Sequence, residues 1–208
     1  MLTMTANNAN PPRDDLKVRY ARRILSRTPS VISLLILVYC VTLALSFPFS
    51  DLQSFAFGIV LLPALVWISS HDFATLEIPD LAVLFVVSAS GVFRALEFGL
   101  SNAFARELLV AAMLTATVWF VGGLFYRRLG REAIGIGDAK LLGAGSLAVG
   151  MPSLAAMVFV ACVGGIIAGL LARRTEALPT TQGVPFGPFV AYSVFLFGLH
   201  PYPGLTQP

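Results

Sequence analysis

The sequence predicts an all-α fold, a polytopic membrane helix bundle of about six core transmembrane helices preceded by one extra N-terminal helix. Of the 208 residues, 57% are hydrophobic and only 12% are charged, whereas an ordinary soluble domain has roughly 25% charged residues. Apolar runs recur along the whole chain. Because one span needs about 20 apolar residues, this length leaves little room for a soluble domain.

The N-terminal segment 1–30 is polar and basic. Its first part is expected to be disordered, and the recurrence of Leu16, Tyr20 and Ile24 favours a short basic helix lying on the membrane. A secretory signal is the competing interpretation, because positive charge precedes the apolar run 31–47. The long polar leader and the lack of a small-x-small cleavage site favour an uncleaved anchor helix instead.

Seven apolar segments are each predicted to be a helix. They cover residues 31–47, 55–70, 80–96, 107–126, 138–150, 153–172 and 186–199. The segment 138–150 is short for a span at about 1.5 Å per residue, so we expect it to tilt or to stop partway. Met151 and Pro152 divide it from the next helix. The expected regions are a cytoplasmic N-terminal segment 1–30, the extra helix within 31–54, a membrane domain 55–199 and a tail 200–208.

The basic residues predict the orientation of the bundle. The N-terminus and the loops 71–79, 127–137 and 173–185 lie on one predicted side. That side holds all but Arg94 and Arg106 of the 14 basic residues, and by the positive-inside rule it is the cytoplasm. We therefore expect the N-terminus inside the cell and the C-terminus outside.

Small residues indicate where the predicted helices touch, because they allow close backbone approach. They are Gly122, Gly123, Gly143, Gly145 and the pair Gly165 and Gly169. The aromatic-rich segment 186–199 is expected to be lipid-facing surface and packing, not a cofactor site.

Several other functions have no support in the sequence. The net charge of +3 comes mostly from the basic N-terminus, which suits anionic lipid, and no nucleic-acid motif accompanies it. Cys40 and Cys162 lie far apart in apolar runs without CxxC spacing, so we expect small core residues and no zinc or redox site. HExxH and GxSxG motifs are absent. We expect no metal, no cofactor and no nucleic-acid partner.

Two aspartates stand at the ends of apolar segments on the same predicted side. Asp72 ends the second helix, and Asp138 begins the fifth in the run Gly135-Ile-Gly-Asp138. An ionised carboxylate is costly in hydrocarbon, so both are expected to face protein or water and to have a function. Gly135 and Gly137 permit a tight turn or a close approach. A helix-capping role for Asp138 is the structural alternative.

Two nearby carboxyl groups in a partly dry site form a known solution to peptide hydrolysis. Like charges at close range cannot both ionise easily, so one group stays protonated while its partner activates water. The protonated group polarises the scissile carbonyl and donates to the leaving nitrogen. Asp72 and Asp138 are therefore the candidate catalytic pair.

Three ordered motifs carry a resemblance to a known family. They are Asp72-Phe-Ala-Thr-Leu-Glu-Ile-Pro-Asp80, Gly135-Ile-Gly-Asp138 followed by Ala-Lys-Leu-Leu, and Pro185-Phe-Gly-Pro188. Together they resemble the type IV prepilin peptidases, GxGD-type aspartyl proteases of the bacterial inner membrane. The resemblance covers about residues 55–199 and implies the family's six-helix core.

The resemblance assigns the catalytic pair to Asp72 and Asp138. It implies a supporting active-site loop of Gly135, Gly137, Lys140, Pro185, Gly187 and Pro188. The sequence departs from the family at Asp80, usually Asn, and at Leu76 and Glu77, where the family is usually basic. Asp80 is expected to cap a helix and is a lesser candidate for the pair, and the acidic loop is expected to affect substrate choice.

Neighbouring groups give further hypotheses. His71 either tunes Asp72 electrostatically or is a plain interfacial histidine, and Lys140 either helps to hold Asp138 ionised or extends to the interface. If Asp72 lies at a helix C-terminus and Asp138 at a helix N-terminus, the dipoles favour a neutral Asp72 and an ionised Asp138.

The resemblance implies prepilin or pilin-like substrates, cleaved on the cytoplasmic face after a short basic leader that ends in Gly. Longer members carry a cysteine-bearing insertion and also methylate the new N-terminus. This sequence resembles the short, peptidase-only kind that serves Flp (Tad) pilus systems. Its expected partners are the substrate and the lipid bilayer. The sequence leaves open whether the chain forms a homo-oligomer.

Two rival functions remain open. In a small ion-coupled transporter the aspartates would bind an ion or relay protons. Their position near one face instead of the midplane, and the lack of a convincing inverted repeat, disfavour that reading. A non-catalytic assembly protein of a pilus or secretion machine is the second rival.

Overall fold

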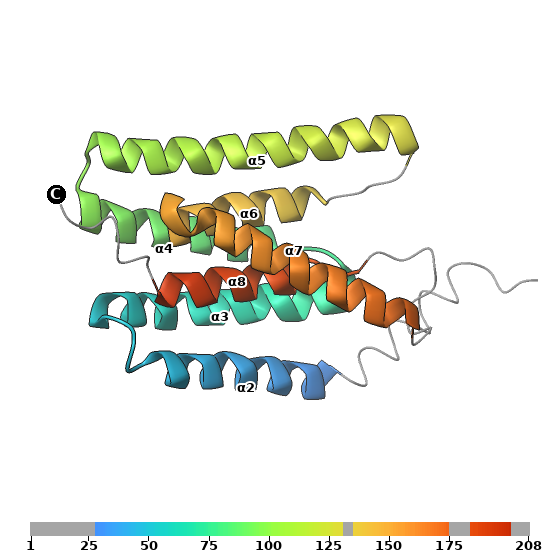
Figure 1. The fold of residues 1–208 in the computed structure, drawn as a ribbon, viewed down its shortest axis with the longest axis horizontal. Helices are drawn as coiled ribbons and strands as arrows, with labels where there is room; N and C mark the ends of the chain where they lie inside the picture. The colour runs from blue at the N-terminus through green and yellow to red at the C-terminus, as the bar shows by residue number, and fades with distance from the viewer. Residues whose placement is uncertain (1–27, 131–134, 175–183, 201–208) are drawn as a thin grey trace, which may run out of the picture.

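The computed structural model describes residues 28–130, 135–174 and 184–200. Within them the chain forms seven α-helices arranged in one bundle (Figure 1). Their bounds are α2 Thr28–Ser46, α3 Leu52–Thr75, α4 Asp80–Phe98, α5 Asn102–Leu129, α6 Ile136–Val149, α7 Met151–Arg174 and α8 Gly187–Leu199. The predicted all-α membrane bundle is confirmed. The expectations for the disordered leader, the surface helix and the tail fall on residues 1–27 and 201–208, outside the described residues.

Four of the described helices, α3, α4, α5 and α7, are long and apolar enough to cross a membrane. Helix α6 has 14 residues and therefore extends about 21 Å at 1.5 Å per residue. Because the hydrocarbon core is about 30 Å thick, α6 is too short for a full span, as its sequence predicted.

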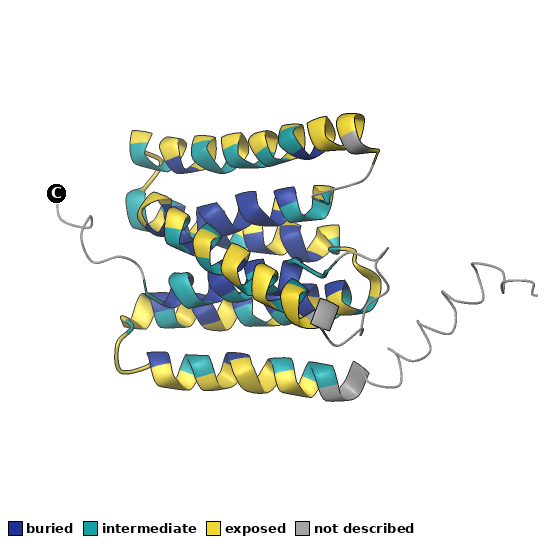
Figure 2. Ribbon diagram, turned by 45° about the vertical axis from the view of Figure 1, so that its right-hand side comes forward, coloured by how far each residue is buried: buried dark blue, intermediate teal, exposed yellow. Residues whose placement is uncertain are grey.

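The two shortest helices, α6 and α8, occupy the centre of the bundle (Figure 2). Helix α8 packs against α3, α6 and α7, and its Val190, Val194 and Phe195 are fully buried. The expectation that segment 186–199 faces lipid is therefore wrong, although its role in packing is confirmed. Because α8 is apolar on all sides, every one of its faces can be buried.

Close approach is confirmed at three of the predicted glycines, including Gly165 of α7, where a Cβ would lie 2.9 Å from the Phe186 ring. A Cβ on Gly143 would overlap the hydroxyl of Thr115 in α5, and a Cβ on Gly145 would overlap Val194 in α8. Glycine therefore lets the central α6 contact both neighbours at backbone distance.

Gly123 and the two cysteines face outward, contrary to expectation. Within the described part of the chain nothing lies within 4 Å of a Cβ placed on Gly123, so no close approach occurs there. Cys40 of α2 and Cys162 of α7 are exposed, so the prediction that they are core residues is wrong. Peripheral helices bury only part of their surface, and apolar composition alone does not tell which side faces lipid.

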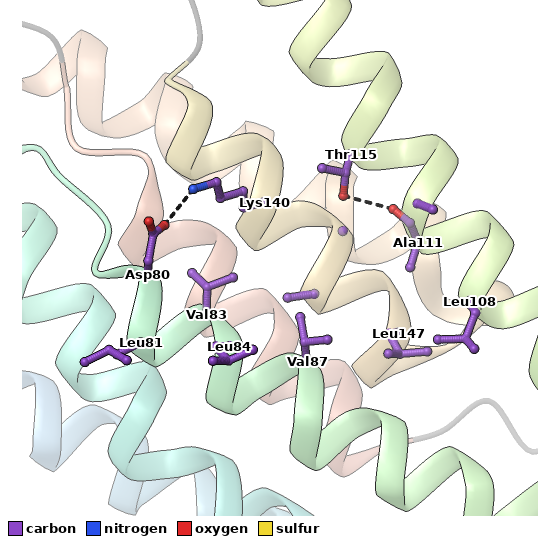
Figure 3. A pocket seen from close by; sticks show the side chains of 13 residues that line it. Asp80, Leu81, Val83, Leu84, Val87, Leu108, Ala111, Thr115, Lys140 and Leu147 are labelled. Atoms are coloured by element: carbon purple, nitrogen blue, oxygen red, sulfur yellow. Dashed lines mark hydrogen bonds and ion pairs between the residues drawn. The ribbon is translucent and has the colours of Figure 1, made fainter.

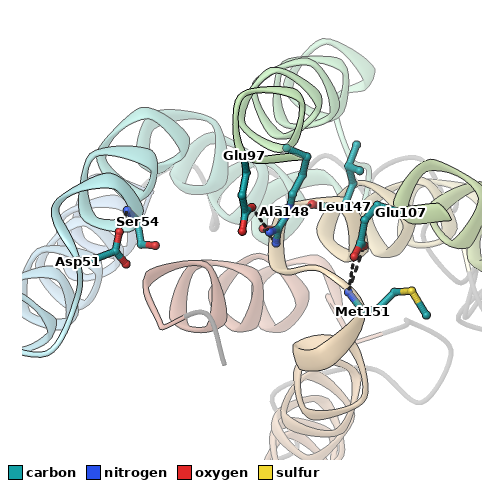
Figure 4. A network of polar contacts seen from close by, with 8 residues as sticks. Asp51, Ser54, Glu97, Glu107, Leu147, Ala148 and Met151 are labelled. Carbon is teal, nitrogen blue, oxygen red and sulfur yellow. Dashed lines mark hydrogen bonds and ion pairs between the residues drawn. The ribbon is translucent and has the colours of Figure 1, made fainter. Parts of the chain in front are cut away.

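Polar contacts hold Leu147 and Ala148 at the C-terminus of α6 (Figure 4). Arg94 of α4 is 5% exposed. It donates from Nε to the Leu147 carbonyl at 3.1 Å and from Nη2 to the Ala148 carbonyl at 3.0 Å. Its Nη1 pairs with Glu97 Oε2 at 2.6 Å. Carbonyls at a helix C-terminus have no partner inside the helix, so Arg94 satisfies groups that would otherwise be buried alone.

The predicted break between α6 and α7 is confirmed, but it lies at Gly150, one residue before the expected Met151 and Pro152, which open α7. Gly150 has a φ of 77°, a conformation that glycine adopts without steric cost. Glu107 of α5 then accepts the backbone N–H of Met151, with Oε2 at 3.1 Å, and so caps the start of α7.

The extra helix α2 packs against α3 and α8. Tyr39 is 1% exposed, and its hydroxyl forms a hydrogen bond with Ser69 Oγ at 3.2 Å. The hydroxyls of Thr42 and Tyr192 form another at 3.0 Å. Helix α2 is therefore an integral part of the bundle, and its status as an uncleaved anchor stays a prediction.

Candidate active site

Asp72 lies in the last turn of α3 and is 4% exposed. Leu76 ends the helix in a left-handed conformation with a φ of 59°, and its N–H donates to the Asp72 carbonyl at 2.9 Å. The chain turns sharply there into the loop 76–79. His71 supports that loop, because its Nδ1 lies 2.8 Å from the Glu77 carbonyl oxygen.

Gly187, in the predicted Pro185 to Pro188 motif, contacts Asp72 directly. Its backbone N–H donates to Asp72 Oδ2 at 2.9 Å. A Cβ at this position would lie 2.9 Å from the same oxygen, closer than a side chain can approach. Pro188 lies in the first turn of α8, where its fixed φ favours the helix. The motif therefore brings a helix N-terminus against the carboxyl group.

Asp138 lies in the first turn of α6, and Gly135 is the N-cap residue. The backbone N–H of Gly135 hydrogen-bonds to the Asp138 carboxylate. This is half of a capping box, in which an acidic residue in the first turn accepts the N–H of the cap residue. The capping alternative is thus real, and it leaves the rest of the carboxylate available for chemistry.

Ile78 joins the two halves of the site. A Cβ on Gly137 would lie 3.0 Å from Ile78 Cβ, and a Cβ on Gly187 would lie 3.2 Å from Ile78 Cδ1. The loop between α3 and α4 therefore packs its isoleucine against the starts of both α6 and α8. Ile78 belongs to the first of the three sequence motifs, and no role was predicted for it, although its position beside Pro79 was the available signal.

The two carboxyl groups interact electrostatically. Asp138 lies outside the four helices that can cross a membrane. Burial raises the pKa of Asp138, and the charge of Asp72 raises it further, against the hydrogen bond from Gly135, from 3.8 to about 6. Asp72 and Asp138 thus belong to one site, and a proton bound there belongs to the pair.

Lys140 lies apart from this pair. Its Nζ contacts Asp80 Oδ1 at 2.7 Å, with the two side chains 44% and 75% exposed. The cation expected to hold Asp138 ionised is therefore paired elsewhere. Asp80 opens α4, but among the described residues the helix start has no side-chain cap. Its exposure sets it apart from the buried Asp72 and disfavours it as a member of the pair.

No group of three or more His, Cys, Asp and Glu side chains within the described ranges is placed to hold a metal ion. The described groups at the site are two carboxyls, the backbone N–H groups of Gly187 and Gly135, and an apolar side chain. Such an arrangement can bind water between carboxyl groups, hold one proton and transfer it.

The model of the type IV leader peptidase family matches residues 59–170, a range that contains both aspartates. Three similar proteins carry the name prepilin leader peptidase/N-methyltransferase. The one from Pectobacterium carotovorum subsp. carotovorum is 32% identical over 137 residues, which are 64% of this chain and 47% of the relative. The one from Burkholderia pseudomallei (strain K96243) is 33% identical over 142 residues, which are 65% of this chain and 43% of the relative.

The third, from Xanthomonas campestris pv. campestris, is 28% identical over 188 residues, which are 88% of this chain and 63% of the relative. This chain thus spans about half the length of the first two relatives. No solved structure matches it significantly.

Proposed function

Because the chain belongs to the type IV leader peptidase family, we propose that it is a membrane-embedded aspartic endopeptidase that removes the leader peptide from prepilins or pilin-like proteins. Asp72 and Asp138 are its catalytic residues. The observation that carries this proposal is the convergence of Asp72, Asp138 and the Gly187 N–H at one end of the bundle. The name of the relatives, prepilin leader peptidase/N-methyltransferase, supports the substrate class.

The pair hydrolyses the peptide bond without a covalent intermediate. The ionised carboxyl takes a proton from water, whose oxygen attacks the scissile carbonyl carbon. The protonated carboxyl stabilises the developing oxyanion and then gives its proton to the leaving nitrogen as the C–N bond breaks. The proton taken from water passes to the other carboxyl and restores the pair.

We assign the water-activating role to Asp138 and the acid role to Asp72. Asp138 lies at the positive end of the α6 dipole and Asp72 at the negative end of the α3 dipole, which favours this distribution of charge. The pKa of about 6 for Asp138 includes the negative charge of Asp72. While Asp72 holds the proton, that contribution is absent, so Asp138 is ionised at neutral pH. The N-terminus of α8 acts on Asp72 in the opposite sense, so the pH profile of the reaction tests the roles.

The enzyme works in the bacterial inner membrane with its catalytic pair on the cytoplasmic face. The excess of basic residues at that end of the bundle supports this orientation. A substrate whose apolar helix enters the bilayer leaves its basic leader in the cytoplasm, where the pair can reach it. A role in Flp (Tad) pilus systems stays a prediction.

The test is cleavage of a co-expressed prepilin, followed by its mobility shift on a gel. We expect Asp72→Ala and Asp138→Ala to abolish processing at matched expression, and Asp80→Ala to retain it. Processing by all variants would contradict the proposal and return both carboxyls to a structural or transport role. Full pilus assembly with Asp138→Ala would instead support a non-catalytic assembly protein.

A further inference from the structure

An open apolar groove runs along the outer side of α6 (Figure 3). Helix α6 forms its floor, and α4 and α5 form its walls. Its volume is about 560 Å³. Apolar residues that define it include Leu84 and Val87 of α4, Leu108 and Ala112 of α5, and Ala144 and Leu147 of α6. Leu84 is 60% exposed, so this wall has no partner within the described chain.

One end of the groove is polar. The ion pair of Asp80 and Lys140 stands there, whereas Leu108 and Leu147 lie at the other end (Figure 3). Lys140 follows Asp138 by two residues, so the polar end lies within one turn of the catalytic pair. At 3.6 residues per turn the two side chains point about 200° apart, which puts the pair and the groove on opposite sides of α6.

We propose that this groove binds the apolar helical segment of the substrate that follows the cleaved bond, an inference that rests on the proposed function. The floor from Lys140 to Leu147 extends about 10 Å, or two helical turns. Ala112 on one wall is small and exposed, which lets a helix lie close to that wall. The polar end of the groove lies within one helical turn of the catalytic pair, so a chain that leaves the groove there can cross the end of α6 to reach that pair.

Charge at the polar end fits the same occupant. Glu77 and Asp80 are exposed, and both belong to the stretch that connects Asp72 to the groove. Asp80 is paired with Lys140, whereas Glu77 has no ion pair among the described residues. Basic residues before the cleaved bond would meet the carboxylate of Glu77. Because a lipid acyl chain or an apolar helix without a basic leader lacks such charges, the polar end favours a substrate segment over either.

The geometry also specifies how the cleaved peptide bond of the substrate reaches the catalytic pair. A chain leaving the groove must cross the end of α6, which is about 10 Å wide. About three residues in extended conformation, at about 3.3 Å each, cover that distance. The cleaved bond therefore lies about three residues before the first helical residue in the groove, and the extended stretch exposes it to water.

Disulfide cross-linking tests this binding mode in membranes. The enzyme carries Asp138→Asn to keep the substrate intact, Cys40→Ala and Cys162→Ala to remove its exposed thiols, and either Leu84→Cys or Phe85→Cys. Both introduced thiols are exposed on adjacent positions of α4, but only position 84 lines the groove. The prepilin carries one cysteine, moved along its apolar segment.

We expect Leu84→Cys to cross-link at prepilin positions that recur about every three to four residues, with about tenfold lower yield for Phe85→Cys. Equal yields for the two variants would overturn the groove as the binding site. Cross-links between two copies of the enzyme, formed in preference to substrate cross-links, would also overturn it and assign the groove to self-association.

A second arm uses the enzyme with its native aspartates. Ala112→Trp fills the groove, whereas Met113→Trp adds bulk to the neighbouring exposed position outside it. We expect about tenfold slower processing with Ala112→Trp only. Wild-type rates for both would contradict the proposed groove and leave the proposed function intact. Cross-linking at Leu84→Cys without any processing by the wild-type enzyme would support the groove and contradict the proposed function.

Discussion

The backbone N–H of Gly187 donates a hydrogen bond to Asp72 Oδ2 at 2.9 Å, across 115 positions of sequence. This contact joins the start of α8 to the end of α3. It occupies one oxygen of the Asp72 carboxyl and so fixes the orientation of that group. Catalysis by two carboxyls depends on such orientation, because small displacements of reacting groups are costly in rate.

Gly187→Ala should therefore impair processing. The added Cβ would lie 2.9 Å from Asp72 Oδ2 and 3.2 Å from Ile78 Cδ1, which forces the carboxyl or the loop to move. We expect a loss of roughly 100-fold in the rate of prepilin cleavage, measured as single-turnover cleavage in detergent. Gly198→Ala, in the same helix, is the control, because its Cβ would lie 3.9 Å from Phe57. Equal rates for the two variants would show that the hydrogen bond does not position Asp72.

The activity should rise with pH between about 4 and 6. Burial raises the pKa of Asp138 above 3.8, and the value of about 6 also includes the charge of Asp72, which is absent while Asp72 holds the catalytic proton. An acid ionises as pH rises through its pKa, so more Asp138 becomes able to accept a proton from water. The dependence of kcat/KM on pH measures this directly. A rate that falls over the same interval would identify Asp138 as the acid and Asp72 as the base.

Asp72→Asn should lower the pKa of Asp138. The substitution removes the negative charge of Asp72 and keeps the shape of its side chain. Burial remains, so we expect a pKa between 3.8 and about 6. Infrared difference spectra against pH follow the protonated-carboxyl band of Asp138 in this otherwise inactive variant. A pKa that stays at about 6 would mean that the two carboxyls do not interact, which would contradict a shared site.

The helices were predictable because hydrocarbon solvent requires long apolar segments with satisfied backbone groups. Met151 and Pro152 marked the break before α7, and the shortness of segment 138–150 was visible in its length. The burial of each helix was harder to predict. Apolar composition is the same for a face against lipid and a face against protein, so Cys40 and the central position of α8 were misjudged.

The candidate pair was predictable from local sequence, because Asp72 and Asp138 are acids at the ends of apolar segments. Their surroundings depend on tertiary contacts. Lys140 is near Asp138 in sequence, but the helix turns it away toward Asp80. Ile78 contacts the starts of two helices that are distant in sequence, and no local pattern shows this.

Arg94→Met should destabilise the bundle. Arg94 is 5% exposed, and its loss leaves the Leu147 and Ala148 carbonyls without their donors and Glu97 without its cation. Removing one partner of a buried charge pair costs about 3 kcal/mol, which thermal unfolding in detergent measures as a lower Tm.

Arg106→Gln is the matched control, because Arg106 is exposed in α5 and should change the Tm little. Equal effects of the two substitutions would contradict a structural role for Arg94. Because Arg94 binds the end of α6 opposite to Asp138, the surviving folded fraction of Arg94→Met should keep its cleavage rate per molecule. The Tm would then fall while the cleavage rate per folded molecule stays unchanged. This result distinguishes a residue that supports the bundle from one that positions the catalytic pair.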